Sequence, residues 1–221
     1  MNNKISRLHY LTQETKTHSH SKNAERCLQN GIDWVQLRIK NRQVEEVLNQ
    51  ALLCRKIALA YNATFIVNDD VKVALESGAD GVHVGNEDMS VKQIRRMVKD
   101  EFIVGATCNT LDEILIAIDD GADYVGIGPF RFTETKKKLN PVLGMQGLEL
   151  IMEQLDKMQI NFPLIAIGGI KPADVKNILK LGIHGVAVSS AINDATDLRK
   201  TINDFKLLTS ERNLEQKITH L

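Results

Sequence analysis

The sequence predicts an α/β protein that folds as a single-domain (β/α)8 TIM barrel. Eight short apolar runs recur along the chain, and each is followed by a stretch with helical apolar spacing. Several helical stretches end in a glycine just before the next apolar run, as at Gly31, Gly78 and Gly121. The chain has 221 residues, which fits one such barrel. An open doubly wound sheet is the alternative, but it usually needs only about five or six strand and helix units.

The eight predicted strands cover residues 7–12, 34–40, 64–69, 81–85, 102–108, 124–130, 164–169 and 185–192. The helical segment after the second strand carries apolar residues three and four positions apart, at Val44, Val47, Leu48 and Ala51. We expect such faces to pack on the barrel. One domain is expected to span residues 1–221, with a polar tail at 211–221 that frays.

Composition argues against several classes of partner. Lys plus Arg is 28 and Asp plus Glu is 28, so no net charge attracts nucleic acid or an anionic membrane. The longest strongly apolar run, residues 162–170, is about half the roughly 20 residues that span a bilayer. No apolar signal segment follows Met1, so a cytoplasmic location is expected. Cys27, Cys54 and Cys108 show no C-x-x-C spacing, which argues against a disulfide framework or a zinc site.

Polar side chains at the carboxyl ends of the strands are the candidates for function, because active sites of such barrels lie there. The second strand ends with Gln36, Arg38 and Lys40, which strand alternation places on one side. Inside a barrel, such a face needs a polar and preferably anionic ligand. The alternative is an outward placement in which the long side-chain stems cover apolar surface.

Acidic residues follow the next two strands. Asn68 and Asp69 end the third strand, whereas Asp70 precedes a helical run and is a natural N-cap. Glu87 and Asp88 follow the fourth strand. These carboxylates could simply pair with nearby cations. An anionic ligand bound at the same place would then be repelled by the carboxylates. A divalent metal resolves the conflict, because Mg²⁺ takes one or two carboxylates together with substrate phosphate oxygens.

The loop after the sixth strand has the composition of a phosphate site. Gly128-Pro129 breaks the strand, and Thr133, Thr135 and Lys136 follow. Threonine hydroxyls donate to phosphate oxygens, and lysine supplies a mobile positive charge. A solvated basic loop is the alternative. We expect residues 131–145 to order over a bound diphosphate.

The remaining strand ends add small polar groups. Thr107 ends the fifth strand, where a neutral hydroxyl suits a heterocycle. Gly168-Gly169 follows the seventh strand and Ser189-Ser190 the eighth, which are the usual positions of a barrel phosphate site. The sequence therefore predicts a second phosphate site.

Other polar residues have structural interpretations. Gly-Ala-Asp occurs at residues 78–80 and 121–123, in the turns that lead from a helix into the next strand. These turns lie on the face opposite the site, so we interpret both aspartates as structural. His83 and His184 have no metal-ligand companion at short spacing, and we interpret them as structural too.

Together these motifs resemble the thiamine phosphate synthase family across residues 5–205. The matching segments are Gln36-Leu37-Arg38-Ile39-Lys40, Asn68-Asp69-Asp70, residues 80–88, Gly128-Pro129 through Thr133-Glu134-Thr135-Lys136, Gly168-Gly169-Ile170 and Ser189-Ser190-Ala191-Ile192. Each motif is short, but their joint order is highly specific.

The resemblance implies a transferase that joins 4-amino-2-methyl-5-hydroxymethylpyrimidine diphosphate to a methylthiazole-ethyl phosphate and releases pyrophosphate. It implies that the pyrimidine diphosphate is bound by Gln36, Arg38, Lys40, Asn68, Thr107 and Lys136. Arg38, Lys40 and Lys136 would stabilise the departing charge, and Asp69 and Asp88 would hold one Mg²⁺ ion per subunit. The thiazole phosphate, or its carboxylate form, would be held by Thr133, Thr135, Gly169, Ser189 and Ser190.

Two departures and two alternatives accompany the resemblance. Thr107 stands where the family often has serine, and Phe132 stands where proline is usual. The related thiazole tautomerase has a histidine after the fifth strand and lacks the metal-binding pair, whereas this chain has Asn109 there. A non-catalytic module that binds thiamine phosphate would lose the leaving-group residues, and none is lost. The sequence does not fix an oligomeric state and is compatible with a homo-oligomer.

Overall fold

The computed structural model describes residues 5–132 and 141–210, and it confirms the predicted barrel. Eight strands form one closed sheet in sequence order, and β8 pairs with β1 to close it. The strands are β1 (Leu8–Leu11), β2 (Trp34–Leu37), β3 (Thr64–Asn68), β4 (Gly81–Val84), β5 (Ile103–Cys108), β6 (Tyr124–Ile127), β7 (Leu164–Ile167) and β8 (Gly185–Val188). All neighbouring pairs are parallel.

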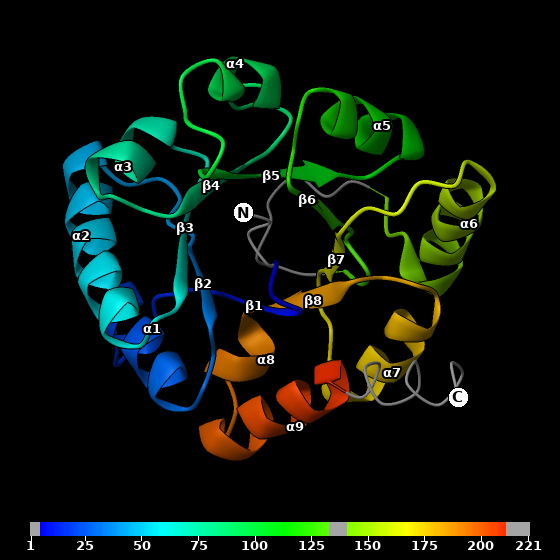
Figure 1. The fold of residues 1–221 in the computed structure, drawn as a ribbon. Helices are drawn as coiled ribbons and strands as arrows, with labels where there is room; N and C mark the ends of the chain where they lie inside the picture. The colour runs from blue at the N-terminus through cyan, green and yellow to red at the C-terminus, as the bar shows by residue number, and fades with distance from the viewer. Residues whose placement is uncertain (1–4, 133–140, 211–221) are drawn as a thin grey trace.

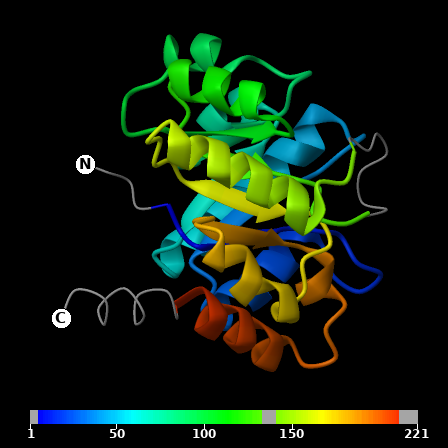
Figure 2. The ribbon, with the colours of Figure 1, turned by 90° about the vertical axis from the view of Figure 1, so that its right-hand side faces the viewer.

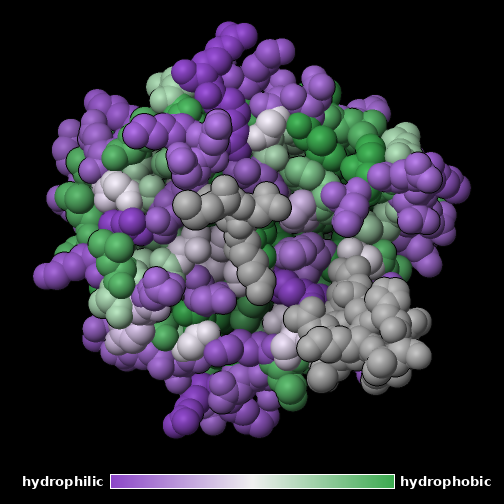
Figure 3. Space-filling view, in the orientation of Figure 1, coloured by the Kyte–Doolittle hydropathy of each residue, from purple (hydrophilic) through white to green (hydrophobic). Residues whose placement is uncertain are grey.

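Helices surround the sheet (Figure 1). They are α1 (His20–Gln29), α2 (Val44–Ala60), α3 (Val71–Glu76), α4 (Val91–Arg95), α5 (Leu111–Asp119), α6 (Gly144–Lys157), α7 (Pro172–Lys180), α8 (Ser190–Asn193) and α9 (Leu198–Ser210). In Figure 2 the arrows of β7 and β8 point to the right, so the carboxyl ends of the strands lie on that side. Figures 1 and 3 look onto the opposite end, where the strands begin.

The prediction placed the ends of several strands too late. The second predicted strand ran to residue 40, but β2 ends at Leu37. The sixth ran to residue 130, but β6 ends at Ile127, because Pro129 has no N–H to continue a ladder. The eighth ran to residue 192, but α8 already begins at Ser190. Arg38 and Lys40 therefore lie on the connection after β2, whereas Ser189 follows β8 and Ser190 begins α8.

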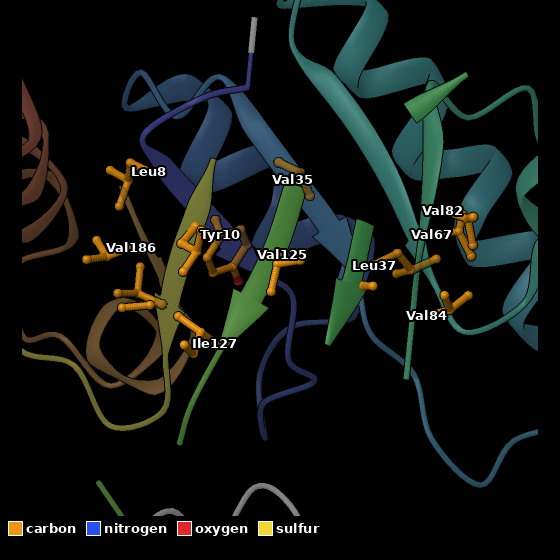
Figure 4. Close-up of a cluster of buried hydrophobic side chains, with 14 of the residues drawn as sticks. Leu8, Tyr10, Val35, Leu37, Val67, Val82, Val84, Val125, Ile127 and Val186 are labelled. Atoms are coloured by element: carbon orange, nitrogen blue, oxygen red, sulfur yellow. The ribbon is translucent and has the colours of Figure 1, made fainter. Parts of the chain in front are cut away.

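Two apolar layers hold the barrel together. The inner layer fills the barrel with Ile5, Leu11, Trp34, Ile66, Ile103, Tyr124, Ile165 and Ala187. The outer layer lies between strands and helices and includes Tyr10, Val35 and Val125 (Figure 4). Adjacent residues such as Tyr10 and Leu11 thus point to opposite sides, as strand alternation requires. Burial of each large side chain contributes about 1.5–3 kcal/mol relative to exposure.

The two Gly-Ala-Asp turns are structural, as the sequence predicted. Gly78 and Gly121 adopt φ of 68° and 93°, a conformation that suits glycine after a helix. The Asp80 carboxylate accepts hydrogen bonds from the Phe65 backbone N–H and from Arg55, both at 2.8 Å. Asp123 repeats this arrangement with the Val104 N–H at 2.7 Å and with Arg95. Each aspartate therefore joins a helix to the start of a neighbouring strand.

An Asp80→Ala variant is expected to lose stability but not activity. It leaves the Phe65 N–H and the half-buried Arg55 without this acceptor, which costs about 1–3 kcal/mol. Chemical denaturation would show the loss. The matched control is Glu25→Ala, which removes an exposed ion pair with Lys22 and should change stability by less than about 0.5 kcal/mol. Equal stability of the Asp80 and Glu25 variants would contradict the structural interpretation.

Hydrophilic side chains predominate around the rim of the barrel end at which the strands begin (Figure 3).

Among the helices of the described residues, none is both long enough and apolar enough to cross a membrane.

Candidate active site

Polar side chains from β2 and β3 meet at the carboxyl end of the barrel. The Gln36 side chain is only 3% exposed, and its Nε2 donates to Asn68 Oδ1 at 2.7 Å. Gln36 also pairs in register with Ile66, a residue of the inner layer. Gln36 therefore faces the barrel interior, and the outward alternative is wrong for this residue.

Arg38 and Lys40 follow β2 and converge on Asp69. The Arg38 backbone N–H donates to Thr12 Oγ1 at 3.1 Å, which anchors this connection to the end of β1. Burial lowers the pKa of Arg38 and the Asp69 carboxylate opposes the change, but a guanidinium stays charged at neutral pH. The Lys40 ammonium donates directly to Asp69 Oδ2. Two cations and a carboxylate are thus gathered at one edge of the mouth.

Asp69 also lies beside Asp88. Burial raises the pKa of Asp69, Lys40 opposes the rise, and the Asp88 carboxylate adds to it. Asp69 has a φ of 71°, a left-handed conformation that is uncommon for residues other than glycine and that aspartate adopts more readily than most. Asp88 Oδ2 accepts the Gly85 backbone N–H at 2.7 Å, which fixes this carboxylate close to the end of β4.

The two carboxylates fit a magnesium ion better than a softer metal. Both offer oxygen donors, which Mg²⁺ prefers. Within residues 5–132 and 141–210, no three His, Cys, Asp or Glu side chains gather closely enough to hold a metal by themselves. The remaining ligands would come from water and substrate, and this is how Mg²⁺ is usually bound at phosphate sites.

Asp70 has a different role from its neighbour. Its Oδ1 accepts the Val73 backbone N–H at 3.0 Å, and it is the N-cap of α3. The prediction that Asp70 is a helix cap is confirmed.

Thr107 lies at one end of a chain of hydrogen bonds that runs inside the barrel through His83 to Tyr124. The His83 ring contacts Thr107 Oγ1 at 2.9 Å through Nε2 and the Tyr124 hydroxyl at 3.0 Å through Nδ1. Two glycines make room for the His83 ring, because a Cβ on Gly126 would lie 3.1 Å from that ring. A Cβ on Gly105 would also collide with His83 and Tyr124.

The sequence interpretation of His83 as merely structural missed its contact with Thr107, a predicted site residue. A usable signal was present, because alternation places His83, Gly105 and Thr107 on the inner face of adjacent strands.

The segment after β6 packs against the turn after β7. The Phe130 N–H donates to Ile167 O at 2.8 Å, and the Arg131 N–H donates to Gly168 O at 2.9 Å. Gly169 has a φ of 66°, so a side chain there would strain the backbone. Three predicted site residues of this loop, Thr133, Thr135 and Lys136, lie outside the described residues, as does most of the segment 131–145.

Ser189 and Ser190 lie where β8 leads into α8. The Asn193 side chain donates to the backbone carbonyl of Ser189 at 3.1 Å, and Ser189 Oγ donates to Gln13 at 3.4 Å. Because β7 and β8 are neighbours in the sheet, Gly169 and the serines belong to adjacent strand ends. This edge carries hydroxyl and backbone groups, whereas Arg38, Lys40 and Asp69 lie at the edge of β2 and β3.

Comparisons with known proteins identify the family to which the chain is similar. The model of a family described as thiamine monophosphate synthase matches residues 8–192. A thiamine-phosphate synthase of Phocaeicola vulgatus is 42% identical over 197 residues, covering 89% of this chain and 95% of the relative. The corresponding protein of Flavobacterium psychrophilum is 38% identical and covers 92% and 96%. The solved structure of a thiamine phosphate pyrophosphorylase from Pyrococcus furiosus has a TM-score of 0.80 and 33% identity, covering 93% and 96%.

Proposed function

The chain belongs to the thiamine monophosphate synthase family, and on this premise we propose how the barrel mouth binds and joins two substrates. The activity is that of a thiamine-phosphate synthase, a transferase of thiamine biosynthesis. We propose that an aminopyrimidine diphosphate and a thiazole phosphate are the substrates. The observation that carries the proposal is the convergence of Arg38, Lys40 and Asp69 at one edge of the mouth.

The pyrimidine ring is assigned to the neutral groups at the centre of the mouth. Gln36 and Asn68 are already joined by a hydrogen bond and offer amide donors and acceptors to a heterocycle. Thr107 supplies a hydroxyl whose orientation is constrained by His83. These groups place the methylene carbon that bears the diphosphate near the cationic edge.

The diphosphate is assigned to Arg38 and Lys40, with Lys136 as a further cation. Their task is to stabilise the negative charge that develops as the carbon–oxygen bond breaks and pyrophosphate leaves with the electron pair. A Mg²⁺ ion on Asp69 and Asp88 would supply further positive charge to the same oxygens. The amino group of the pyrimidine donates electron density to the resulting methylene cation, so no enzyme nucleophile is required.

The thiazole phosphate is assigned to Gly169, Ser189 and Ser190, together with Thr133 and Thr135. Hydroxyls and a glycine backbone bind phosphate without adding bulk. Held there, the thiazole presents its ring nitrogen, whose lone pair forms the new carbon–nitrogen bond. The protein thereby converts an encounter of two substrates into a positioned reaction.

The tautomerase alternative is disfavoured by Asn109. This residue is buried, and its side-chain amide donates to the Gly128 carbonyl, so it serves as a structural link and offers no acid or base. The paired carboxylates that the tautomerase lacks are both present. A non-catalytic module is disfavoured as well, because Arg38 and Lys40 remain gathered at the mouth.

A Ser190→Asp variant is expected to separate the two phosphate sites. A carboxylate at this position repels the thiazole phosphate, which should raise the KM for that substrate by about tenfold or more. The KM for the pyrimidine diphosphate should change little, since Ser190 lies at the β8 edge. Steady-state kinetics with each substrate varied in turn measures both constants. Equal effects on the two constants would contradict the division.

Ligand binding tests the proposed sites without turnover. Titration calorimetry should show that pyrophosphate binds tightly only with Mg²⁺ present, because Asp69 and Asp88 otherwise repel it. Thiazole phosphate binding should depend weakly on Mg²⁺. Tight pyrophosphate binding in a metal-free solution would overturn the assignment of the metal.

A further inference from the structure

Arg131 ties the end of β6 to the turn that follows β7. Its guanidinium donates to Gly169 O at 3.0 Å through Nη1 and to Asp174 Oδ1 at 2.6 Å through Nη2. Nη1 also donates to the second Asp174 oxygen, so the ion pair is bidentate. The Arg131 backbone N–H adds a bond to Gly168 O. One residue therefore contacts Gly168, Gly169 and the first turn of α7.

Asp174 is a charged group within this turn. It lies in the first turn of α7, its side chain is 13% exposed, and its Oδ2 accepts the Lys171 backbone N–H at 2.8 Å. The hydrogen bond from Arg131 holds the pKa of Asp174 below its usual value, against the opposing effect of burial. The backbone N–H of Lys171 and the positive charges of Arg131 and Lys171 also favour the ionised form. A full negative charge is thus fixed close to the backbone of Gly169.

This charge conflicts with an anionic ligand at the same turn. A phosphate bound at Gly169 would lie near the Asp174 carboxylate, because Arg131 Nη1 contacts both groups, and like charges at short range weaken binding. Arg131 removes the conflict, because its planar guanidinium neutralises the carboxylate and matches its two oxygens. The Arg131 side chain is 45% exposed, so the pair by itself contributes little to stability. Its larger effect is on the charge and geometry of the turn.

We propose that Arg131 is a positioning residue for the thiazole phosphate. It neutralises Asp174 beside the Gly169 turn so that an anion can bind there. The inference rests on the proposed function, since it takes Gly169 as part of the thiazole phosphate site.

Kinetics of four variants test the proposal. Arg131→Met should raise the KM for thiazole phosphate about tenfold and change kcat and the KM for pyrimidine diphosphate by less than about twofold. Arg131→Lys should give an intermediate effect, because an ammonium cannot form the bidentate pair. Asp174→Asn removes the repelling charge and should change the KM by less than about threefold. The double variant Arg131→Met with Asp174→Asn should recover most of the lost affinity.

Other outcomes would overturn the proposal. If Arg131 itself bound the phosphate, Asp174→Asn would free it and lower the KM, and the double variant would be as weak as Arg131→Met. If the pair were only structural, Arg131→Met would lower the melting temperature and leave the KM unchanged. The matched control is Arg42→Met, which removes an arginine that is 50% exposed and paired with Glu14 at 3.1 Å. Its KM for thiazole phosphate should equal that of the wild type.

Calorimetric binding of thiamine phosphate provides a readout that does not depend on turnover. Arg131→Met should weaken this binding by the same factor as the KM, and the double variant should restore it. If the wild-type protein neither binds nor forms thiamine phosphate, both the proposed function and this inference are wrong. If the wild-type protein is active but its Arg131→Met variant binds thiamine phosphate with unchanged affinity, only this inference is wrong.

Discussion

Asp69→Asn and Asp88→Asn variants are each expected to lose about 10³-fold in turnover, with partial recovery only at high Mg²⁺ concentration. Asparagine preserves the size of the side chain but removes the charge that would hold the metal against the diphosphate. A metal-bound diphosphate is stabilised by several kcal/mol as it leaves, and about 4 kcal/mol corresponds to this loss of rate. Initial rates measured across a Mg²⁺ titration give both the maximal rate and the metal requirement of each variant.

Asp70→Asn provides the control, since this residue is the neighbour of Asp69 but caps α3. Asparagine caps a helix about as well as aspartate, so the expected cost is only a few tenths of a kcal/mol. Turnover should remain close to that of the wild type. The assignment of the metal pair would be wrong if the Asp70 variant were as inactive as the other two. It would also be wrong if the Asp88 variant kept the wild-type dependence on Mg²⁺.

Arg38→Met is expected to lower turnover by about 10²- to 10³-fold, the usual effect of removing one preorganised donor to a developing anion. Arg38 is half-buried at the mouth and lies near Asp69, so water screens its charge only in part. Arg38→Lys should recover only part of the rate, because lysine lacks the planar fork that matches phosphate oxygens. Single-turnover kinetics with saturating substrates isolates the bond-breaking step from product release.

Arg42→Met is the matched control for Arg38→Met as well, because it removes a cation four positions further along the same connection. Arg42 is half exposed and pairs with Glu14 and Glu46. Its single-turnover rate should match that of the wild type. An Arg38 variant that affects only the KM for thiazole phosphate would place this arginine at the other substrate.

The sequence predicted the barrel, and the meeting of polar side chains at its mouth, for a physical reason. Parallel strands of a barrel all end on one face, so polar residues at strand ends must meet there whatever their separation in the chain. Gln36 and Asn68 are 32 residues apart and form a hydrogen bond, and Asp69 lies beside Asp88 as the metal hypothesis requires.

The exact ends of strands and the contacts between distant side chains were not predictable in this way. The β2 ladder ends at Leu37 although the alternating pattern continues to Lys40, because periodicity does not show where pairing stops. The partners of His83 lie 24 and 41 residues away, and alternation, which places His83 on the inner face, does not by itself identify them. The ion pair of Arg131 and Asp174 joins residues 43 positions apart on neighbouring connections. No local pattern in the sequence distinguishes these two from solvated surface charges.

Formation of thiamine phosphate by the purified chain tests the central claim most directly. The protein is incubated with the pyrimidine diphosphate, the thiazole phosphate and Mg²⁺, and products are followed by mass spectrometry and a pyrophosphate assay. We expect thiamine phosphate and pyrophosphate to appear in equal amounts, and thiamine phosphate to be absent when either substrate is omitted. Failure to form thiamine phosphate from both substrates at saturating concentrations, with the protein folded and Mg²⁺ present, would contradict the account.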